Sequence, residues 1–169
     1  MRLQQLVAAV VVLCSLARAA DPAPATLDYR KEKDGYLLVL KPGQKVIESL
    51  KALTEKEHLP GAHFTAIGAV KNAEVAYYNL ETKAYQPKKF ETPAEVISLT
   101  GSLGYFEDKP IVHAHLAMGG PDYQIYGGHL VEAEVSIVLE IFVTPTQEKI
   151  VRELTTEFPG VRVMNLKAK

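Results

Sequence analysis

The segment IVHAHLAM, residues 111–118, decides how this chain is interpreted, because two sets of side chains alternate along it. Such alternation is typical of a β-strand, in which successive side chains point to opposite faces. One face would carry only apolar side chains, those of Val112, Ala114, Leu116 and Met118. His113 and His115 would leave the other face together, about 6–7 Å apart along the strand. The segment therefore predicts a half-buried strand with two imidazoles on the face away from the core.

A third histidine, His129, is separated from His115 by thirteen residues and lies within the next predicted strand, 124–131. If the two strands pair, three imidazoles converge on one point. Three protein ligands and an open fourth position are typical of catalytic zinc sites, whereas structural zinc sites close all four positions. Gly127 and Gly128 remove bulk in front of His129, so that backbone or ligand can approach closely. The spacing alone leaves two interpretations open: a metal site, or three histidines on a polar surface.

Strands joined by short turns are predicted over most of the chain. The other predicted strands are 36–40, 64–70, 73–80, 85–90, 95–104, 134–143 and an edge strand at 161–166. Apolar residues recur at helical spacing over 44–58, and Pro60-Gly61 ends that helix.

A second helix is predicted near the C-terminus. Thr144 would cap it, Pro145 suits the first helical position, and Gln147 completes a capping box. Its apolar side would consist of Ile150, Val151 and Leu154, and Pro159-Gly160 would end it. Many strands with two helices, early and late, predict an α+β fold with one large, mostly antiparallel sheet in a single domain.

The N-terminus has the pattern of a secretory signal peptide. A positive start, an apolar run over 6–16 and the small-x-small motif Ala17-Arg18-Ala19 predict cleavage before Ala20. The predicted division is a signal peptide at 1–19, a flexible leader at 20–34 and the domain at 35–169. Cys14, the one cysteine, would leave with the signal, so we expect no disulfide, no membrane anchor and a secreted or periplasmic protein.

The charge pattern argues against nucleic acid as a partner. The chain has a formal net charge of −1, and the predicted signal peptide removes two arginines and no acid. Proteins that neutralise phosphates usually show a basic patch, which is not visible here. A glycine-rich phosphate loop and a nucleophile-elbow serine are also missing from the sequence.

Two carboxylates are candidates for catalysis. Glu140 stands among Leu139, Ile141 and Phe142, and Glu95 opens a similar apolar run. A buried carboxylate without a partner is costly, so an acid in such surroundings often has a function. Either could act as a general base or orient a metal-bound histidine. The alternative, that each is a strand acid reaching water, stays open for both.

Four motifs in order resemble the plant and prokaryote conserved (PPC) domain: FTAIGAV at 64–70, EVISLTGS at 95–102, HAHL at 113–116 and GGHL at 127–130. The resemblance implies an α+β fold and a homotrimer. Family members are often named DNA-binding proteins, but plant members contact DNA through a separate AT-hook, and this chain has no Arg-Gly-Arg-Pro motif. The fold also resembles that of acetolactate decarboxylase, which implies zinc, or another divalent transition metal, held by His113, His115 and His129.

Three functions follow from these observations. The first is an exported homotrimeric binding protein whose three-histidine site holds zinc and a small anionic ligand. The second is a zinc-dependent lyase or hydrolase, with Glu140 or Glu95 as the base. The third, which export and negative charge disfavour, is DNA binding.

Overall fold

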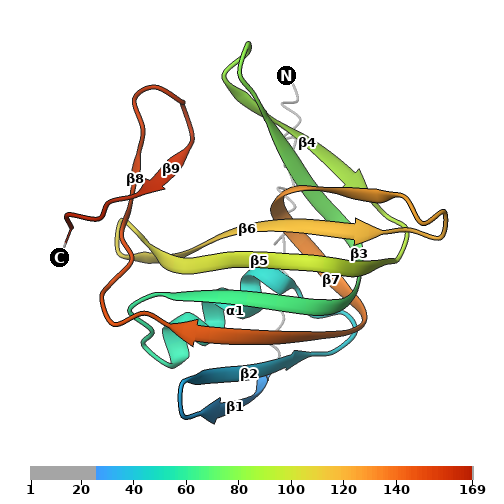
Figure 1. The fold of residues 1–169 in the computed structure, drawn as a ribbon, viewed down its shortest axis with the longest axis horizontal. Helices are drawn as coiled ribbons and strands as arrows, with labels where there is room; N and C mark the ends of the chain where they lie inside the picture. The colour runs from blue at the N-terminus through green and yellow to red at the C-terminus, as the bar shows by residue number, and fades with distance from the viewer. Residues whose placement is uncertain (1–25, 169) are drawn as a thin grey trace, which may run out of the picture.

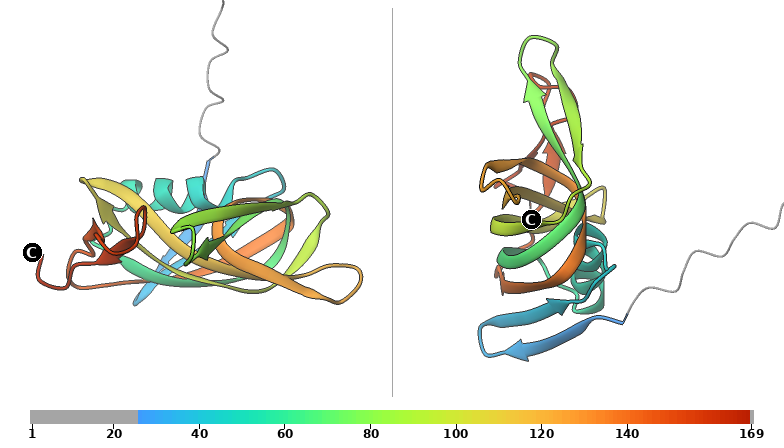
Figure 2. Two further views of the ribbon diagram at one scale, coloured as in Figure 1. Left: turned by 90° about the horizontal axis from the view of Figure 1, so that it is seen from above. Right: turned by 90° about the vertical axis from the view of Figure 1, so that its right-hand side faces the viewer.

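The computed structural model describes residues 26–168, and the fold is a bent antiparallel sheet covered on one face by a helix (Figures 1 and 2). The predicted signal peptide and cleavage site lie outside the described residues. The main sheet has seven strands in the order β1-β2-β7-β6-β5-β3-β4, and β7 also pairs with β3. The strands are β1 (Asp28–Glu32), β2 (Gly35–Leu40), β3 (Ala62–Asn79), β4 (Ala84–Phe90), β5 (Ala94–Phe106), β6 (Lys109–Gly119) and β7 (Ile125–Pro145). The prediction of one α+β domain dominated by an antiparallel sheet is confirmed.

The sheet begins earlier than predicted. Strand β1 lies inside the segment assigned to a flexible leader, and it pairs with β2 from Asp28 opposite Val39 to Glu32 opposite Gly35. Residues 28–34 therefore belong to the sheet, since a tight turn at 33–34 folds β1 back on β2.

The two longest strands each merge two predicted strands. Strand β3 joins 64–70 to 73–80, and β7 joins 124–131 to 134–143. Both strands bend where their mutual pairing shifts register, and Asn72 has a φ of 48° at the bend in β3. A β-bulge bends a strand without ending it, so each pair of predicted strands is one continuous, bent strand. As a result, β7 leaves β6 after His129 and continues along β3 (Figure 1).

The helix predicted at 44–58 is observed as α1 (Val46–Lys56). Its apolar side chains are buried with those of β2, β3, β5 and β6 in one core, which includes Leu38, Leu50, Leu53, Phe64, Leu99 and Leu116. No side chain of its own caps the helix. Instead, the Glu132 carboxylate on β7 accepts hydrogen bonds from the backbone N–H groups of Ile47 (2.9 Å) and Glu48 (3.3 Å). This cap fixes the start of α1 beside β7.

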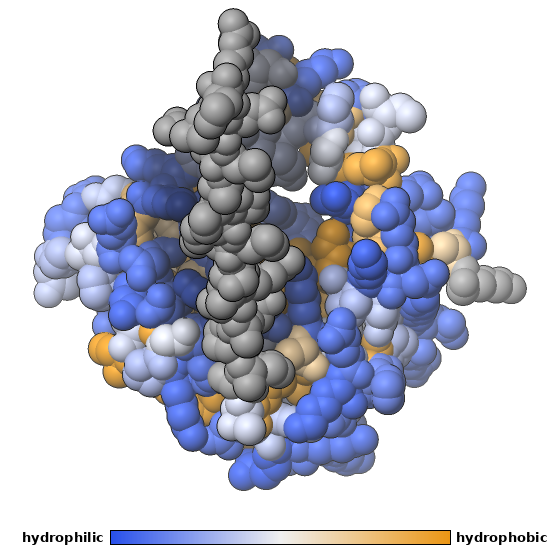
Figure 3. Space-filling view, turned by 180° about the vertical axis from the view of Figure 1, so that it is seen from behind, coloured by the Kyte–Doolittle hydropathy of each residue, from blue (hydrophilic) through white to orange (hydrophobic). Residues whose placement is uncertain are grey.

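Figure 3 shows the molecule from behind, from the side on which α1 lies. The visible surface there is largely hydrophilic, with small apolar patches. No helix in the described part of the chain is both long and apolar enough to cross a membrane.

The C-terminal helix prediction is wrong. The segment after β7 is extended and forms a small hairpin of β8 (Arg152–Leu154) and β9 (Arg162–Met164), so the predicted edge strand at 161–166 pairs within this hairpin. Backbone hydrogen bonds tie the segment to the body: Ile150 donates to the Pro60 carbonyl (3.0 Å), and Tyr105 donates to the Ile150 carbonyl (2.8 Å).

Tertiary packing explains why this segment is extended despite its helical pattern. The Ile150 side chain fills the space that two glycines leave, since a Cβ on Gly61 would lie 2.5 Å from its Cγ1 and one on Gly104 would lie 2.7 Å from its Cγ2. Local capping signals contribute only about 1 kcal/mol, so burial and pairing of this kind override them.

Candidate metal centre

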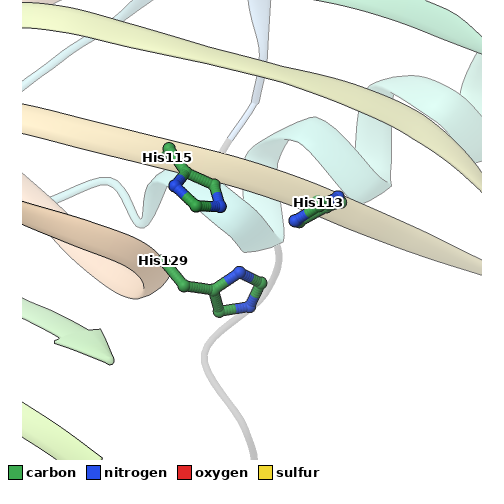
Figure 4. Close-up of side chains that lie close together, drawn as sticks. All are labelled: His113, His115 and His129. Carbon is green, nitrogen blue, oxygen red and sulfur yellow. The ribbon is translucent and has the colours of Figure 1, made fainter. Parts of the chain in front are cut away.

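The three histidines come together where β6 and β7 pair. His115 and His129 are direct partners across the two strands, and His113 lies two residues from His115 on β6. Each residue offers a ring nitrogen, and these atoms all lie within 4.8 Å of one another. Figure 4 shows the three rings gathered around one space from two neighbouring strands. The arrangement predicted from the spacing is therefore the one that the fold builds.

Gly127 allows the two strands to approach. A Cβ at this position would lie 2.2 Å from the carbonyl oxygen of Leu116, on the opposite strand. A glycine here lets β7 lie against β6 and brings His129 level with His115. The space that the absence of a side chain at Gly127 leaves is thus filled by the backbone of β6.

The β3–β4 hairpin supplies a wall to the site. The ring of Tyr85, on β4, lies 5.2 Å from the ring of His129, tilted by 34°. Tyr85 in turn packs edge-on against Tyr78 at 5.0 Å. These contacts hold the His129 ring from the side away from β6.

The surroundings of His113 and His129 favour neutral rings. Burial, followed by the nearby Arg152, His129 and His115, lowers the pKa of His113 to about 4. Burial, followed by His115 and Arg152, also lowers the pKa of His129. A neutral imidazole keeps a free electron pair on one ring nitrogen, which is the form that binds a metal ion.

Comparison with known proteins identifies the family. The chain matches the Plants and Prokaryotes Conserved (PCC) domain over residues 27–147. It belongs to this family. The PCC domain thus includes β1 and ends just after β7, so the β8–β9 hairpin lies beyond the matched region.

Several solved structures share the PCC fold. A metal-containing protein from Archaeoglobus fulgidus is 33% identical with a TM-score of 0.72, covering 83% of this chain and 98% of its own. A candidate DNA-binding protein from Ralstonia eutropha is 33% identical with a TM-score of 0.75, covering 82% and 95%. A plant- and prokaryote-conserved protein from Pyrococcus horikoshii is 32% identical with a TM-score of 0.69, covering 80% and 92%.

No curated protein matches the chain. The likeness to acetolactate decarboxylase from Bacillus subtilis is weak, with a TM-score of 0.44 and 12% identity, and no reaction is carried over from it.

The two carboxylates suggested for catalysis lie elsewhere. Glu140 is exposed on β7, eleven residues beyond His129, opposite Val39 and Ile67. Glu95 is exposed near the start of β5, opposite Gly119. The residues next to them in sequence that are buried, Leu139, Ile141 and Val96, point to the other face of the sheet. Phe142 and Ile97 are exposed on the same face as the two carboxylates, and both carboxylates reach water. Neither lines the cavity beside the histidines, and their predicted role as base or orienting partner has no supporting contact among the described residues.

Arg152 is the residue at this site that sequence reasoning missed. It lies on β8, is only 5% exposed, and lines the cavity that also contains His113 and His129. The sequence placed this arginine in a C-terminal helix, where a charged residue normally faces water. No local pattern pointed to a buried position, because the position results from how the hairpin docks on β5.

The lowered pKa of His113 has a measurable consequence. In the metal-free protein, His113 should titrate at about 4, well below its ordinary value of 6.5. Between these two values the unfolded chain binds a proton at His113 that the folded protein does not. Stability should therefore fall as the pH drops from 6.5 towards 4.

Resolved imidazole NMR signals, followed from pH 8 to 3.5, would measure this titration, with urea-unfolded protein as the control. A midpoint near 6.5 in the folded state would contradict the prediction. Proton competition with a metal ion at His113 should accordingly begin well below pH 6.5.

Proposed function

We propose that this PCC-domain protein binds one divalent metal ion, zinc in the first instance, through His113, His115 and His129. The observation that carries the proposal is three ligand nitrogens within 4.8 Å on two paired strands. The metal-containing relative from Archaeoglobus fulgidus supports it. DNA binding, which the Ralstonia relative's description suggests, finds no support in a net charge of −1.

The donor set fits zinc. Imidazole nitrogen is a regular zinc ligand, and three protein ligands leave one position open for water or a small ligand. A bound zinc ion at such a site can polarise a carbonyl or lower the pKa of a bound water. The chain's own contribution is to favour neutral rings at His113 and His129 and to fix the positions of the three histidines through the β6–β7 pairing.

Metal uptake tests the proposal directly. Protein stripped with a chelator should take up one equivalent of zinc at pH 7.5 by calorimetry, and elemental measurement after dialysis should give one ion per chain. Uptake should disappear in the triple variant His113→Ala, His115→Ala, His129→Ala. The double variant His58→Ala, His63→Ala is the matched control, because both residues are exposed and lie outside the cluster. If the wild type takes up no zinc, cobalt or nickel, the metal proposal fails.

We further propose that the protein assembles as a homotrimer, the state that the resemblance implies. Large apolar side chains are exposed on three neighbouring strands of the sheet: Ile97 on β5 (55%), Ile67 on β3 (55%), and Ile137 (65%) and Phe142 (52%) on β7. The exposed Glu140 lies among them, directly opposite Ile67. Large exposed apolar residues gathered on one face in this way commonly mark an interface between chains.

Static light scattering should give three chain masses for the wild type. The variant Ile67→Lys replaces an apolar side chain of this group with a charged one and should give a monomer that keeps its far-ultraviolet circular dichroism. The control Leu80→Lys alters a residue that is also exposed (65%), directly after the end of β3, and should stay trimeric. A wild type that is monomeric at micromolar concentration would refute the proposal.

Export is also proposed, on the signal-peptide pattern of the first nineteen residues. N-terminal sequencing of the protein recovered from the secreted or periplasmic fraction should begin Ala-Asp-Pro, corresponding to cleavage before Ala20. Replacing Ala17 and Ala19 with bulky leucines should block cleavage, whereas replacing Ala23 and Ala25 in the same way should not. Full-length protein found only in the cytoplasm would overturn this proposal.

A further inference from the structure

A cavity of about 310 Å³ opens beside the histidines, at the point where β7 leaves β6. Its walls come from α1, β4, β6, β7 and the β8–β9 hairpin, and they include His113 and His129. This volume is at the lower end of the range found for small-molecule sites. The cavity can therefore hold a small ligand within reach of the metal centre.

Arg152 carries a buried positive charge in the wall of this cavity. Its Nη1 donates to the carbonyl oxygen of Arg162 (3.1 Å) and its Nη2 donates to Ser102 Oγ (2.8 Å). Its Nε has no hydrogen-bond partner, and no carboxylate forms an ion pair with it among residues 26–168. Burial lowers the pKa of the guanidinium, but arginine stays charged in proteins. A buried charge without a partner is costly, and native structures rarely retain one without a reason.

Ser102 places this charge next to the metal centre. Ser102 on β5 is the direct cross-strand partner of His113 on β6. Directly opposed residues have Cβ atoms about 4.5–5.5 Å apart on the same face of the sheet. Because Arg152 is hydrogen-bonded to Ser102, its guanidinium lies about one side chain away from the His113 ring.

The charge of the cavity selects for an anion. Lys51 and Arg162 line it together with Arg152, and none of the described residues that line it is acidic. A divalent ion on the histidines would add further positive charge. Most of the remaining wall is apolar: Ile47, Ile111, Val112, Leu130, Val131 and Val161. Such walls suit a carboxylate with a short hydrocarbon chain better than an inorganic anion, which has no apolar part.

We propose that the cavity binds a small organic carboxylate whose carboxyl group pairs with Arg152 beside the three-histidine centre. Ser102 and the Arg162 carbonyl orient the guanidinium, and the apolar wall receives the hydrocarbon chain. The inference rests on the proposed function in one respect: a metal ion on the three histidines would give the ligand a second point of attachment. Pairing of the carboxyl group with Arg152 does not require the metal.

The probe is 3-methylbutanoate, titrated by calorimetry into the metal-free and the zinc-loaded protein. Its neutral isostere 3-methylbutanamide and inorganic phosphate serve as matched comparisons. The carboxylate should bind one per chain in both forms, roughly tenfold or more tighter than the amide, because a charge-assisted hydrogen bond is lost with the amide. It should also bind more tightly than phosphate. The Nε–H NMR signal of Arg152 should shift on addition of the carboxylate.

Two variants keep the test decisive. Arg152→Gln should lower carboxylate affinity roughly tenfold or more, with zinc uptake unchanged, whereas Arg30→Gln, which alters an exposed arginine paired with Glu32, should change neither. If Arg152→Gln does not fold, Ser102→Ala is the alternative variant. It removes one hydrogen bond that orients the guanidinium and should lower carboxylate affinity by a smaller factor.

The outcomes separate the two proposals. Zinc uptake without carboxylate binding, or equal affinity for the carboxylate, the amide and phosphate, overturns the carboxylate site and leaves the metal centre standing. Carboxylate binding that depends on Arg152 in a protein that takes up no metal would support the carboxylate site while the metal proposal fails.

Discussion

Replacing His115 with alanine should lower zinc affinity by roughly 100-fold or more, since the site loses one of three ligands and even the loss of a residue outside the ligand set often costs 10–100-fold. The domain should stay folded, because His115 is exposed and packs into no part of the core. The position matters for a second reason: His115 is the ring that pairs directly across to His129. Competition calorimetry at pH 7.5 against a chelator of known affinity would measure the loss.

The matched control is His63→Ala, which removes an exposed histidine on β3 and should leave zinc affinity unchanged. Thermal unfolding of both metal-free variants should coincide with that of the wild type. Unchanged zinc affinity in His115→Ala would show that the three rings do not act as one ligand set, and the assignment of the site would then fail.

Replacing Gly127 with alanine should damage both stability and the site. The added Cβ would lie 2.2 Å from the carbonyl oxygen of Leu116 and 3.1 Å from the Cα of Ala117, so the β6 backbone would have to move. Forcing extra atoms into a tightly packed place typically costs about 1–3 kcal/mol of stability, occasionally more. Separation of β6 from β7 would also draw His129 away from His115, so zinc affinity should fall together with the free energy of unfolding. Urea denaturation and calorimetry on the same preparation would measure both.

Gly119→Ala is the control, because it lies in the same β6–β7 hairpin but its Cβ would meet only side-chain atoms at 3.5 Å or more. It should change stability by less than about 1 kcal/mol and leave zinc affinity as it is. Equal effects from the two substitutions would mean that close approach of the strands at Gly127 does not hold the site together.

The residues of β6 show how much of the site could be predicted. Alternation along 111–118 identifies the strand and the buried side chains of Ala114, Leu116 and Met118, all of which lie in the core. The same alternation places His113 and His115 on one face, because side chains two residues apart on a strand point the same way. Helix α1 was predictable for a similar reason, since its apolar spacing matches 3.6 residues per turn and Pro60-Gly61 ends it. These features depend on local geometry, which the order of residues contains.

The behaviour of the two acids and of the C-terminal segment depends on contacts between distant residues. Glu140 has apolar neighbours in sequence, yet it reaches water because it points away from α1. Thr144, Pro145 and Gln147 carry a helix-capping pattern, yet the segment is extended because Ile150 packs where Gly61 and Gly104 have no side chains. In both cases the conformation or exposure depends on packing against residues that are distant in the sequence.

The sequence by itself therefore determined the strand pattern, the helix, the family and the three histidines, since each follows from spacing along one element or between neighbouring ones. Only the tertiary structure brought Arg152 to the histidines. That arginine reaches the cavity because a hairpin far along the chain docks on β5, where Ser102 accepts its hydrogen bond opposite His113. No periodicity encodes such a contact, because its energy comes from packing and hydrogen bonds that exist only once the sheet is assembled.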